Sequence, residues 1–429
     1  MDLAGKKVAY ITLGCKLNFS ETSTIRHSLE DAGTRTVGEK DGADIFVVNT
    51  CSVTDMAEKK GRQLIRKLVH HNPDAYIVVV GCYAQLRAKE ILSIEGVDLV
   101  LGANEKFNVE HYLKHLETIE KSEPHSCDIF QLSTFDLAYS FGDRTRCFLK
   151  IQDGCDYFCT YCTIPFARGR SRSASVAQIV EAVREVAVKG IREVILTGVN
   201  TGDFGRHSGD DFLSLIKTLD GMDEIERYRI SSIEPNLLTE EIIAFVAGSR
   251  HFMPHFHVPL QSGSNEVLRL MRRKYTREAF ADKIGSIRRI IPDAFIGVDT
   301  IVGMRGETEE CFRDARRFIE ELDISQLHVF PYSERKGTKA LEIPLVVSPE
   351  EKHRRVNELI DISAQKLRQF YHRFEGQIRP VLFEDHKIGN YISGFTDNYI
   401  KIQKPYQPSL ANQIIPVKLT GECFGWEDR

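Results

Sequence analysis

Short β-rich runs alternate with amphipathic helical runs along most of this chain of 429 residues. Before residue 117 the β-rich runs cover residues 8–14, 43–50, 75–81 and 98–102, with helical spacing of apolar residues between them. A strand–helix–strand repeat favours a parallel sheet with helices on both faces, because each helix carries the chain back to the start of the next strand. We therefore predict an α/β fold that begins with a doubly wound domain over residues 1–117.

The remaining chain divides into three further stretches. Ser, Glu, Pro and Asp collect between residues 118 and 144, which is typical of a connector. Six strand–helix units follow over residues 145–374 and predict a partial parallel (β/α)6 barrel, in which residues 265–291 are expected to be one helical stretch. Short alternating runs separated by turn residues then predict a small antiparallel β-barrel over residues 375–429.

Composition narrows the class of protein. The chain has 42% hydrophobic and 28% charged residues, which is ordinary for a folded globular protein. The N-terminus lacks the apolar core of a signal peptide, and no run of about eighteen apolar residues is present. We expect a cytoplasmic protein with no membrane association, whose ten cysteines are reduced and available to metals. Because the net charge is −4, any binding of nucleic acid must rely on local basic stripes.

Three cysteines lie close together in the run GCDYFCTYC, at Cys155, Cys159 and Cys162. Structural zinc sites usually have four ligands, often as two C-x2-C pairs, and no second pair follows here. A 4Fe-4S cluster held by three cysteines keeps one iron open, and that iron can chelate the amino and carboxylate groups of S-adenosylmethionine (SAM). One electron can then break a carbon–sulfur bond and release a 5′-deoxyadenosyl radical. The spacing therefore indicates a SAM-cleaving iron–sulfur site after the first barrel strand.

A second set of three cysteines lies in the first domain. Cys15, Cys51 and Cys82 each directly follow one of its first three β-rich runs. The carboxyl ends of parallel strands share one edge, where open α/β folds usually bind ligands, so three thiolates can converge there. Alternatively, these are small buried residues at strand ends, because free cysteine is among the most buried residue types.

Motifs along nearly the whole chain resemble the MtaB branch of the methylthiotransferase family of radical SAM enzymes. They are TLGCKLN around Cys15, VNTCSVTDMAEKKGRQLIRK around Cys51, GCYAQ around Cys82 and, downstream, IPFARGRSRS, SSIEPNLLTEEII, HVPLQSGSNEVLRLMRRKYT and HVFPYSERKGTKA. One departure is GMRGET, where the family usually has a Phe-Pro pair in place of Met304 and Arg305.

This resemblance implies two 4Fe-4S clusters, an auxiliary one on the first cysteine set and the SAM cluster on the second, followed by a C-terminal TRAM domain. It implies conversion of N6-threonylcarbamoyladenosine at position 37 of tRNA to its 2-methylthio derivative, with one SAM as methyl donor and one as radical source. The implied partners are the tRNA anticodon stem-loop and an electron donor such as flavodoxin or ferredoxin. Because hydrogen-atom abstraction requires no general base, no catalytic residue is expected beyond the clusters.

The resemblance also suggests residues around the cofactor. They lie in the cysteine loop or at the carboxyl ends of barrel strands: Tyr161, Thr197, Gly198, Asn200, Ser231, Glu234, Gln261, Ser262 and Gly303. Tyr161 could equally be a packing aromatic, and polar groups at strand ends are also common as helix caps.

Basic residues are the expected route to RNA. Arg168, Arg170 and Arg172 follow the SAM loop, and the carboxylate of a threonylcarbamoyl group suits a bidentate guanidinium partner. The run LMRRKYTR, residues 270–277, either contacts RNA or is a solvated helix face. In the terminal barrel, Lys401 and Lys404 accompany aromatic residues that either stack on unpaired bases or fill the barrel core: Tyr391, Phe395 and Tyr399.

Two other functions compete with this interpretation. The same chemistry could act on isopentenyladenosine in tRNA or on an aspartate of a ribosomal protein. A non-catalytic, zinc-stabilised RNA-binding protein would explain the barrel and the basic stripes. It would not explain two cysteine sets that each have three ligands, because a structural zinc site usually has four.

Overall fold

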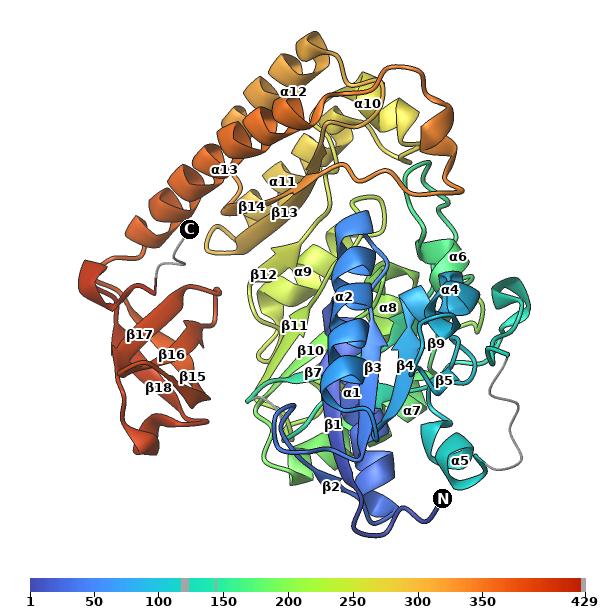
Figure 1. Cartoon of the computed structure of the whole chain (residues 1–429). Coiled ribbons are helices and arrows are strands. Elements are labelled where there is room, and N and C mark those ends of the chain that lie inside the picture. Colours follow the sequence, from blue (N-terminus) through green and yellow to red (C-terminus); the bar gives the residue numbers. More distant parts are fainter. Residues whose placement is uncertain (117–122, 143–144, 426–429) are drawn as a thin grey trace.

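The computed structural model describes residues 1–116, 123–142 and 145–425. The N-terminal part is a five-stranded parallel sheet in the order β2-β1-β3-β4-β5, with helices on both faces (Figure 1). The six residues of β3 are all buried, as expected for a strand covered on both faces. The predicted doubly wound domain is therefore confirmed. Its strands are β1 (Lys7–Thr12), β2 (Arg35–Thr36), β3 (Ile45–Thr50), β4 (Tyr76–Gly81) and β5 (Leu99–Val100), and its helices are α1 (Lys16–Asp31), α2 (Asp55–His71), α3 (Cys82–Leu86), α4 (Ala88–Leu92) and α5 (Val109–Lys114).

Six parallel strands form the predicted partial barrel. Sheet β11-β10-β7 and sheet β12-β13-β14 are joined by single bridges from Tyr228 to Phe252 and from Ser232 to His257, so the strands follow one another in chain order. These strands are β7 (Cys147–Lys150), β10 (Glu193–Thr197), β11 (Arg227–Ile230), β12 (His255–His257), β13 (Phe295–Val302) and β14 (Gln326–Pro331). A short antiparallel pair, β8 (Gln152–Asp153) and β9 (Arg172–Ser173), flanks the cysteine loop.

Helices cover the outside of this barrel, except the first, which packs against α3 of the first domain. They are α6 (Ile164–Arg168), α7 (Val176–Val188), α8 (Phe212–Asp220), α9 (Glu240–Gly248), α10 (Asn265–Leu270), α11 (Arg277–Ile290), α12 (Glu309–Glu321) and α13 (Pro349–His372). The expectation of one helical stretch over residues 265–291 is wrong. Arg272 has a φ of 57°, which ends the helical path, and the Thr276 hydroxyl accepts from the Ala279 amide to start α11 afresh.

The stretch expected as a connector contains structure of its own. Residues 129–131 form a single 3-10 turn, and β6 (Ala138–Tyr139) pairs antiparallel with β7. Thr24 in α1 is hydrogen-bonded to both backbone groups of Tyr139, so this stretch ties the first domain to the barrel. The expected boundary between residues 117 and 118, and that between 144 and 145, include residues outside the described ones and stay predictions.

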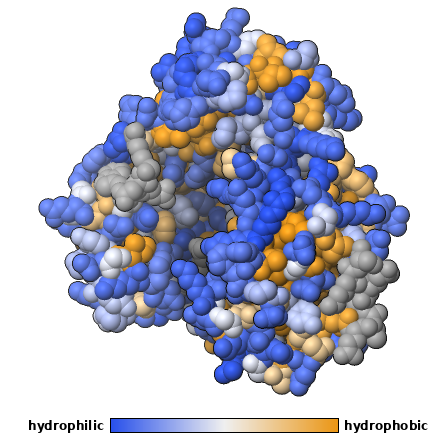
Figure 2. Space-filling model, viewed as in Figure 1, coloured by the Kyte–Doolittle hydropathy of each residue, from blue (hydrophilic) through white to orange (hydrophobic). Residues whose placement is uncertain are grey.

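The C-terminal part is an antiparallel half-barrel in the order β17-β16-β15-β18. Its strands are β15 (Ile378–Ile388), β16 (Tyr391–Thr396), β17 (Lys401–Pro405) and β18 (Ile414–Lys418). The chain turns between β16 and β17, where Tyr399 has a φ of 67°. Figure 2 shows the molecular surface hollowed between this module, on the left, and the rest of the chain.

The half-barrel is packed against the N-terminal end of the larger barrel. Arg229, which is 1% exposed, donates to the carbonyls of Thr396 and Asp397. Phe295 at the start of β13 joins the apolar core of the half-barrel together with Phe374. Across the described residues, no helix is both long and apolar enough to cross a bilayer.

Candidate iron–sulfur and SAM site

The first cysteine set lies at the carboxyl ends of three adjacent strands. Cys15 precedes α1, Cys51 directly follows β3 and Cys82 begins α3 after β4, while β1, β3 and β4 are neighbours in the sheet. Gly14, with a φ of 110°, allows the chain to pass close to Cys51: a Cβ there would lie 2.8 Å from the Cys51 Cβ. The strand order therefore brings together thiols that are far apart in the sequence.

The second set lies on a loop that follows β8. The amides of Tyr157 and Ile164 point at the sulfurs of Cys155 and Cys162, at 3.5 and 3.4 Å. Amide donors of this kind stabilise sulfur that carries negative charge. The loop therefore suits three thiolates that bind a metal centre.

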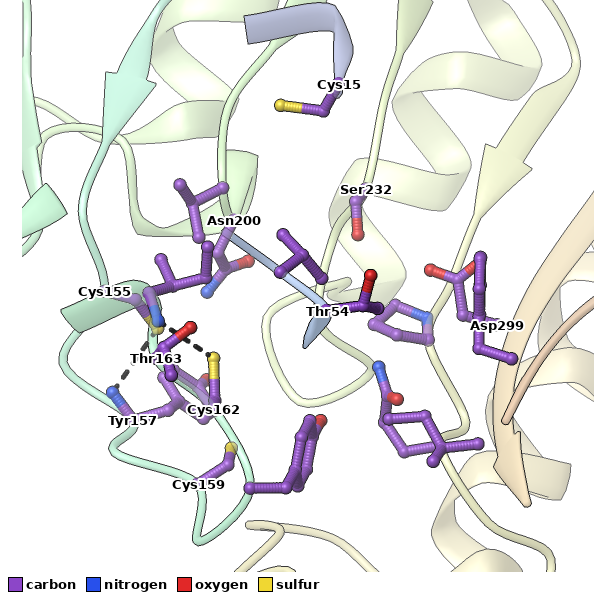
Figure 3. A pocket seen from close by; sticks show the side chains of 18 of the residues that line it. Cys15, Thr54, Cys155, Tyr157, Cys159, Cys162, Thr163, Asn200, Ser232 and Asp299 are labelled. Atoms are coloured by element: carbon purple, nitrogen blue, oxygen red, sulfur yellow. Dashed lines mark hydrogen bonds between the residues drawn. The ribbon is translucent and has the colours of Figure 1, made fainter. Parts of the chain in front are cut away.

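Both sets line a single cavity of about 420 Å³, shown from close by in Figure 3. Cys15 enters it from the first domain, while Cys155, Cys159 and Cys162 lie together on the opposite side. Two donor sets of three sulfurs thus face one space. This is the arrangement expected if two clusters with an open iron each act on one substrate.

Burial makes these thiols poor acids in the absence of a metal. It raises the pKa of Cys82 and of Cys162 to about 12, and it also raises the pKa of Cys51, Cys155 and Cys159. A bound cation reverses this effect, because its charge stabilises the thiolates that coordinate it. The chemistry and number of the donors fit an iron–sulfur cluster at each set.

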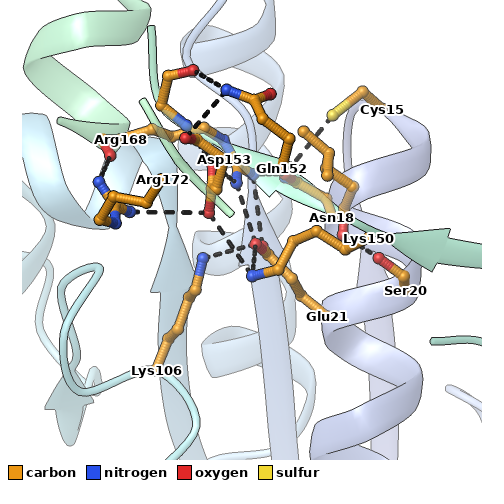
Figure 4. A network of polar contacts seen from close by, with 12 residues as sticks. Cys15, Asn18, Ser20, Glu21, Lys106, Lys150, Gln152, Asp153, Arg168 and Arg172 are labelled. Atoms are coloured by element: carbon orange, nitrogen blue, oxygen red, sulfur yellow. Dashed lines mark hydrogen bonds and ion pairs between the residues drawn. The ribbon is translucent and has the colours of Figure 1, made fainter. Parts of the chain in front are cut away.

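Beneath the first cysteine set lies a buried network of charges (Figure 4). Arg168, which is 3% exposed, donates to Glu21 and Asp153 at 2.9 Å each and to Asn18 at 2.6 Å. Lys106 donates to Glu21 at 2.6 Å, and Lys150 lies 3.3 Å from the same oxygen. Because its donors already have protein acceptors, Arg168 is placed to hold the two domains together rather than to bind a substrate carboxylate.

The other two arginines of the sequence expectation do not line the cavity. Arg170 has a side chain that is 61% exposed and lies near Asp156 and Phe158. Arg172 donates to the carbonyls of Thr134, Arg168 and Arg170, so it fixes the backbone of its own loop. Neither placement supports the expected role in substrate recognition.

The residues expected around SAM fall into two groups. Five of them line the cavity: Tyr161, Gly198, Asn200, Glu234 and Gln261. Four others are outside its lining: Thr197, Ser231, Ser262 and Gly303. Strand alternation explains Ser231, because side chains of successive residues point to opposite faces and Ser232 is the one that lines the cavity.

The departure from the family pattern at Met304 and Arg305 leaves the local turn formed. Met304 is fully buried in a small apolar cluster beside Tyr161. Arg305 donates to the carbonyls of Leu341 and Ile343 and so fastens the turn to the following segment.

Sequence reasoning missed a cavity residue in the break between α10 and α11. Arg273, expected as an RNA contact or a solvated residue, lies 3.1 Å from the Cys159 sulfur and pairs with Glu234, and its side chain is 3% exposed. Thr276, as a helix N-cap residue, is a sequence signal that could have predicted the start of α11. Nothing in the sequence shows that the Arg273 side chain points into the cavity. Asp299 on β13 also lines the cavity and was not anticipated.

Two family descriptions match the chain: the radical SAM superfamily over residues 149–319, and an uncharacterized protein family, UPF0004, over residues 7–102. The threonylcarbamoyladenosine tRNA methylthiotransferase MtaB of Bacillus subtilis is 38% identical over 96% of this chain and 93% of its own length. The tRNA-2-methylthio-N(6)-dimethylallyladenosine synthase of Pelotomaculum thermopropionicum is 32% identical over 97% of this chain and 95% of its own length. Among solved structures, the radical SAM methyltransferase TsrM of Kitasatospora setae shares the fold with a TM-score of 0.57 at 14% identity, covering 76% of this chain and 73% of that one.

Proposed function

Because this chain belongs to the MtaB family of radical SAM tRNA methylthiotransferases, we propose that it methylthiolates C2 of N6-threonylcarbamoyladenosine at position 37 of tRNA. The observation that carries the proposal is the single cavity lined by two sets of three cysteines. One SAM would serve as methyl donor and a second as radical source. The tRNA anticodon stem-loop would be the substrate, and a flavodoxin or ferredoxin would supply the electron.

The family uses two 4Fe-4S clusters and SAM. In this chain Cys155, Cys159 and Cys162 would hold the SAM cluster, and the set formed by Cys15, Cys51 and Cys82 would hold the auxiliary one. When bound, the first supplies the electron that cleaves SAM and the second presents the sulfur to be transferred.

The remaining cavity residues would orient the cofactor. Glu234 and Arg273 place a carboxylate and a guanidinium beside Cys159, which complements the ammonium and carboxylate of a methionyl group. Asn200 is held by its own contacts: its amide donates to Gln152 at 2.9 Å and its side chain to Asp203 at 3.0 Å. A side chain fixed in this way can position a ligand without a further loss of its own conformational entropy on binding.

Cysteine variants test this assignment. Cys51→Ala is expected to retain reductive SAM cleavage but to lose the methylthiolated nucleoside, because only the auxiliary site is disrupted. Cys159→Ala is expected to lose both, since a three-ligand site that loses a ligand loses its cluster. Cys147→Ala is the matched control, because Cys147 is buried in β7 outside the cavity lining.

The readouts are iron content, 5′-deoxyadenosine release and mass spectrometry of tRNA nucleosides. Wild type with both clusters should hold roughly eight irons per chain. Bound zinc in place of iron would point to the non-catalytic RNA-binding alternative. Wild-type product on Cys51→Ala, or normal 5′-deoxyadenosine release by Cys159→Ala, would contradict the cysteine roles.

A second candidate substrate is isopentenyladenosine in tRNA, because relatives that are 30–33% identical are named for dimethylallyladenosine. Stem-loops that carry either nucleotide, offered to the same reconstituted enzyme, separate the two substrates. Turnover of the isopentenyl stem-loop alone would replace the proposed substrate.

A further inference from the structure

Three phenylalanines form an aromatic patch on the surface beside the second cysteine set. Phe158 lies in the cysteine loop, Phe166 on α6 and Phe130 in the 3-10 turn of residues 129–131. The centroid of the Phe130 ring lies 6.2 Å from that of Phe158 and 5.9 Å from that of Phe166. The Phe158 and Phe166 centroids are 6.1 Å apart, so each ring interacts with the other two.

This patch is open to solvent although its rings are apolar. Phe130 is 42% exposed, Phe166 is 40% exposed and Phe158 is half-buried. Large apolar groups that gather on a surface mark a site of interaction with another molecule. Phe158 also has a φ of 50°, which a residue other than glycine seldom adopts, so the loop holds this ring in place at some cost in backbone energy.

The patch lies outside the cavity that would hold SAM and the substrate. Tyr157, Cys159 and Ile164 line that cavity, whereas Phe158 and Phe166 are outside its lining. Figure 1 shows α6 on the side of the molecule opposite the C-terminal half-barrel. A partner on the patch would therefore contact the cysteine loop from outside, without competing with a substrate in the cavity.

Exposed cations flank the patch. The Arg170 guanidinium lies 5.7 Å from the centroid of the Phe158 ring, and its side chain is 61% exposed. On the same loop, the Thr160 carbonyl accepts from the Ala340 amide at 2.9 Å, which brings the exposed Lys339 beside the loop. Across the described residues, the Lys339 ammonium has no hydrogen-bond or ion-pair partner. It is thus available to a carboxylate of a second protein.

The acidic side chains at the patch already have partners within the chain. Asp156 lies 3.5 Å from Arg170 and 3.1 Å from His207, and its side chain is only 11% exposed. Asp128 accepts from the Phe130 amide at 3.1 Å. The patch therefore combines an apolar centre with a rim whose available charge is positive. Such a surface suits a protein with an apolar centre and an acidic rim, because complementary charges favour the encounter.

We propose that this patch binds the protein that supplies the electron, and that this protein is a flavodoxin, a small acidic carrier. This inference rests on the proposed function and deepens it, because it names the partner of the second cysteine set. A flavin presents a planar apolar ring edge that can pack on phenylalanine rings, which favours a flavodoxin over a ferredoxin. One peptide bond joins Phe158 to Cys159, so a donor on the patch is close to the cluster ligands.

The step itself is the transfer of one electron. The reduced flavin is oxidised by one electron, the cluster held by the second cysteine set is reduced by one, and no bond of the enzyme forms or breaks. Interfaces for such transfer are small and short-lived, so three rings and a few charges are enough to carry one.

The test uses the reconstituted enzyme and a purified flavodoxin. Calorimetry measures the Kd of the oxidised flavodoxin. Release of 5′-deoxyadenosine is measured with flavodoxin reduced by NADPH and its reductase, and separately with dithionite, a small reductant that needs no docking surface. Phe130→Ser, Phe166→Ser and Lys339→Glu should each raise the Kd about tenfold and lower the flavodoxin-driven rate about tenfold below saturation. The dithionite-driven rate should stay unchanged.

Two exposed positions outside the patch give matched controls. Ile360→Ser on α13 removes an apolar side chain that is 39% exposed, and Arg317→Glu on α12 reverses a charge on a side chain that is 73% exposed. Both variants should bind flavodoxin as wild type does.

The other outcomes contradict the inference in distinguishable ways. An unchanged Kd and flavodoxin-driven rate in both phenylalanine variants, or no binding of flavodoxin to wild type, would overturn it while the proposed function stands. An equal loss of the dithionite-driven rate would show that the patch only supports the cysteine loop. A raised Kd for the tRNA stem-loop, with unchanged affinity for flavodoxin, would assign the patch to RNA instead. The proposed function fails separately, if wild type with dithionite makes no methylthiolated nucleoside.

Discussion

Arg168 shows how much a single side chain depends on its surroundings. A guanidinium buried between two carboxylates is stable only while those carboxylates are present, because an unpaired buried charge is costly. The same ion pair on the surface would contribute little to the free energy of unfolding. The contrast with Arg170, two residues away and mostly exposed, makes this effect measurable.

We expect Arg168→Ala to lower the free energy of unfolding by about 3–5 kcal/mol, since Glu21 and Asp153 lose their shared partner. Arg170→Ala, the control, should change it by less than about 0.5 kcal/mol. Urea unfolding of the iron-free chains measures both. Equal stability of the two variants would contradict the structural role of Arg168.

The Glu21 carboxyl, in the same network of charges, makes the free energy of unfolding depend on pH. Burial opposes its ionisation, but Arg168, Lys106 and Lys150 lower its pKa from 4.5 to about 2. A carboxyl group with a depressed pKa stabilises the fold above its unfolded pKa, and that stability is lost as the pH falls from about 4.5 towards 2. The loss amounts to roughly 3 kcal/mol.

Unfolding of the iron-free chain at a series of pH values tests this prediction. The Glu21→Gln variant should lack this part of the acid dependence, whereas Glu224→Gln on the surface should retain it. An identical acid profile for wild type and Glu21→Gln would show that the carboxylate is not held in this way.

At the scale of elements, the C-terminal half-barrel is less separate than its sequence suggests. The alternating runs of the sequence predict a separate small β-barrel over residues 375–429. In the structure, Arg227 donates to the carbonyls of Pro380 and Phe395, and the Tyr399 ring lies 4.4 Å from that of His255 on β12. A truncated chain would leave these buried groups without partners, so truncation does not isolate a role in tRNA binding.

Phe295 tests this docking with one substitution. It packs edge-on against Phe370 at 5.3 Å and lies in the shared apolar core, so Phe295→Ala should cost about 3–5 kcal/mol and expose the half-barrel to protease. Phe330→Ala is the control, because that ring is 48% exposed and its loss should cost less than about 1 kcal/mol. Unchanged proteolysis and unfolding in Phe295→Ala would refute the docked arrangement.

At the scale of the whole molecule, the cavity exists only while the first domain and the barrel stay together. Arg335, which is 4% exposed, pairs with Glu58 and donates to Ser52 at 2.9 Å, directly after Cys51. The Asp55 amide also donates to Ser333 at 3.0 Å. These contacts join α2 to the segment after β14 and so set the separation of the two cysteine sets.

We expect Arg335→Ala to destabilise this interface by about 3–5 kcal/mol, because Glu58 is left buried without its cation. SAM cleavage should persist, since it needs only the barrel cysteines, whereas methylthiolation should fall. Arg354→Ala, in an exposed charge network on α13, is the control and should leave both activities unchanged. Parallel loss of SAM cleavage and product in Arg335→Ala would contradict a role confined to the interface.

The sequence by itself determined the fold class, both cysteine sets and the edge of the first sheet at which one of them lies. These features follow from local periodicity and from the shared edge of parallel strands, which neighbouring residues specify. It did not determine which of Ser231 and Ser232 faces the cavity, because a shift of one residue reverses the face of a strand. It also did not show where the Arg273 side chain points, because that depends on the end of the helical path at Arg272.

Only the tertiary structure decided that both cysteine sets open into one space and that Arg168 lies among Glu21, Asp153 and Asn18. Cys15 and Cys155, or Glu21 and Arg168, are joined by no local pattern. Their meeting depends on how two independently formed sheets pack, and that packing is set by side-chain contacts between residues far apart in the chain.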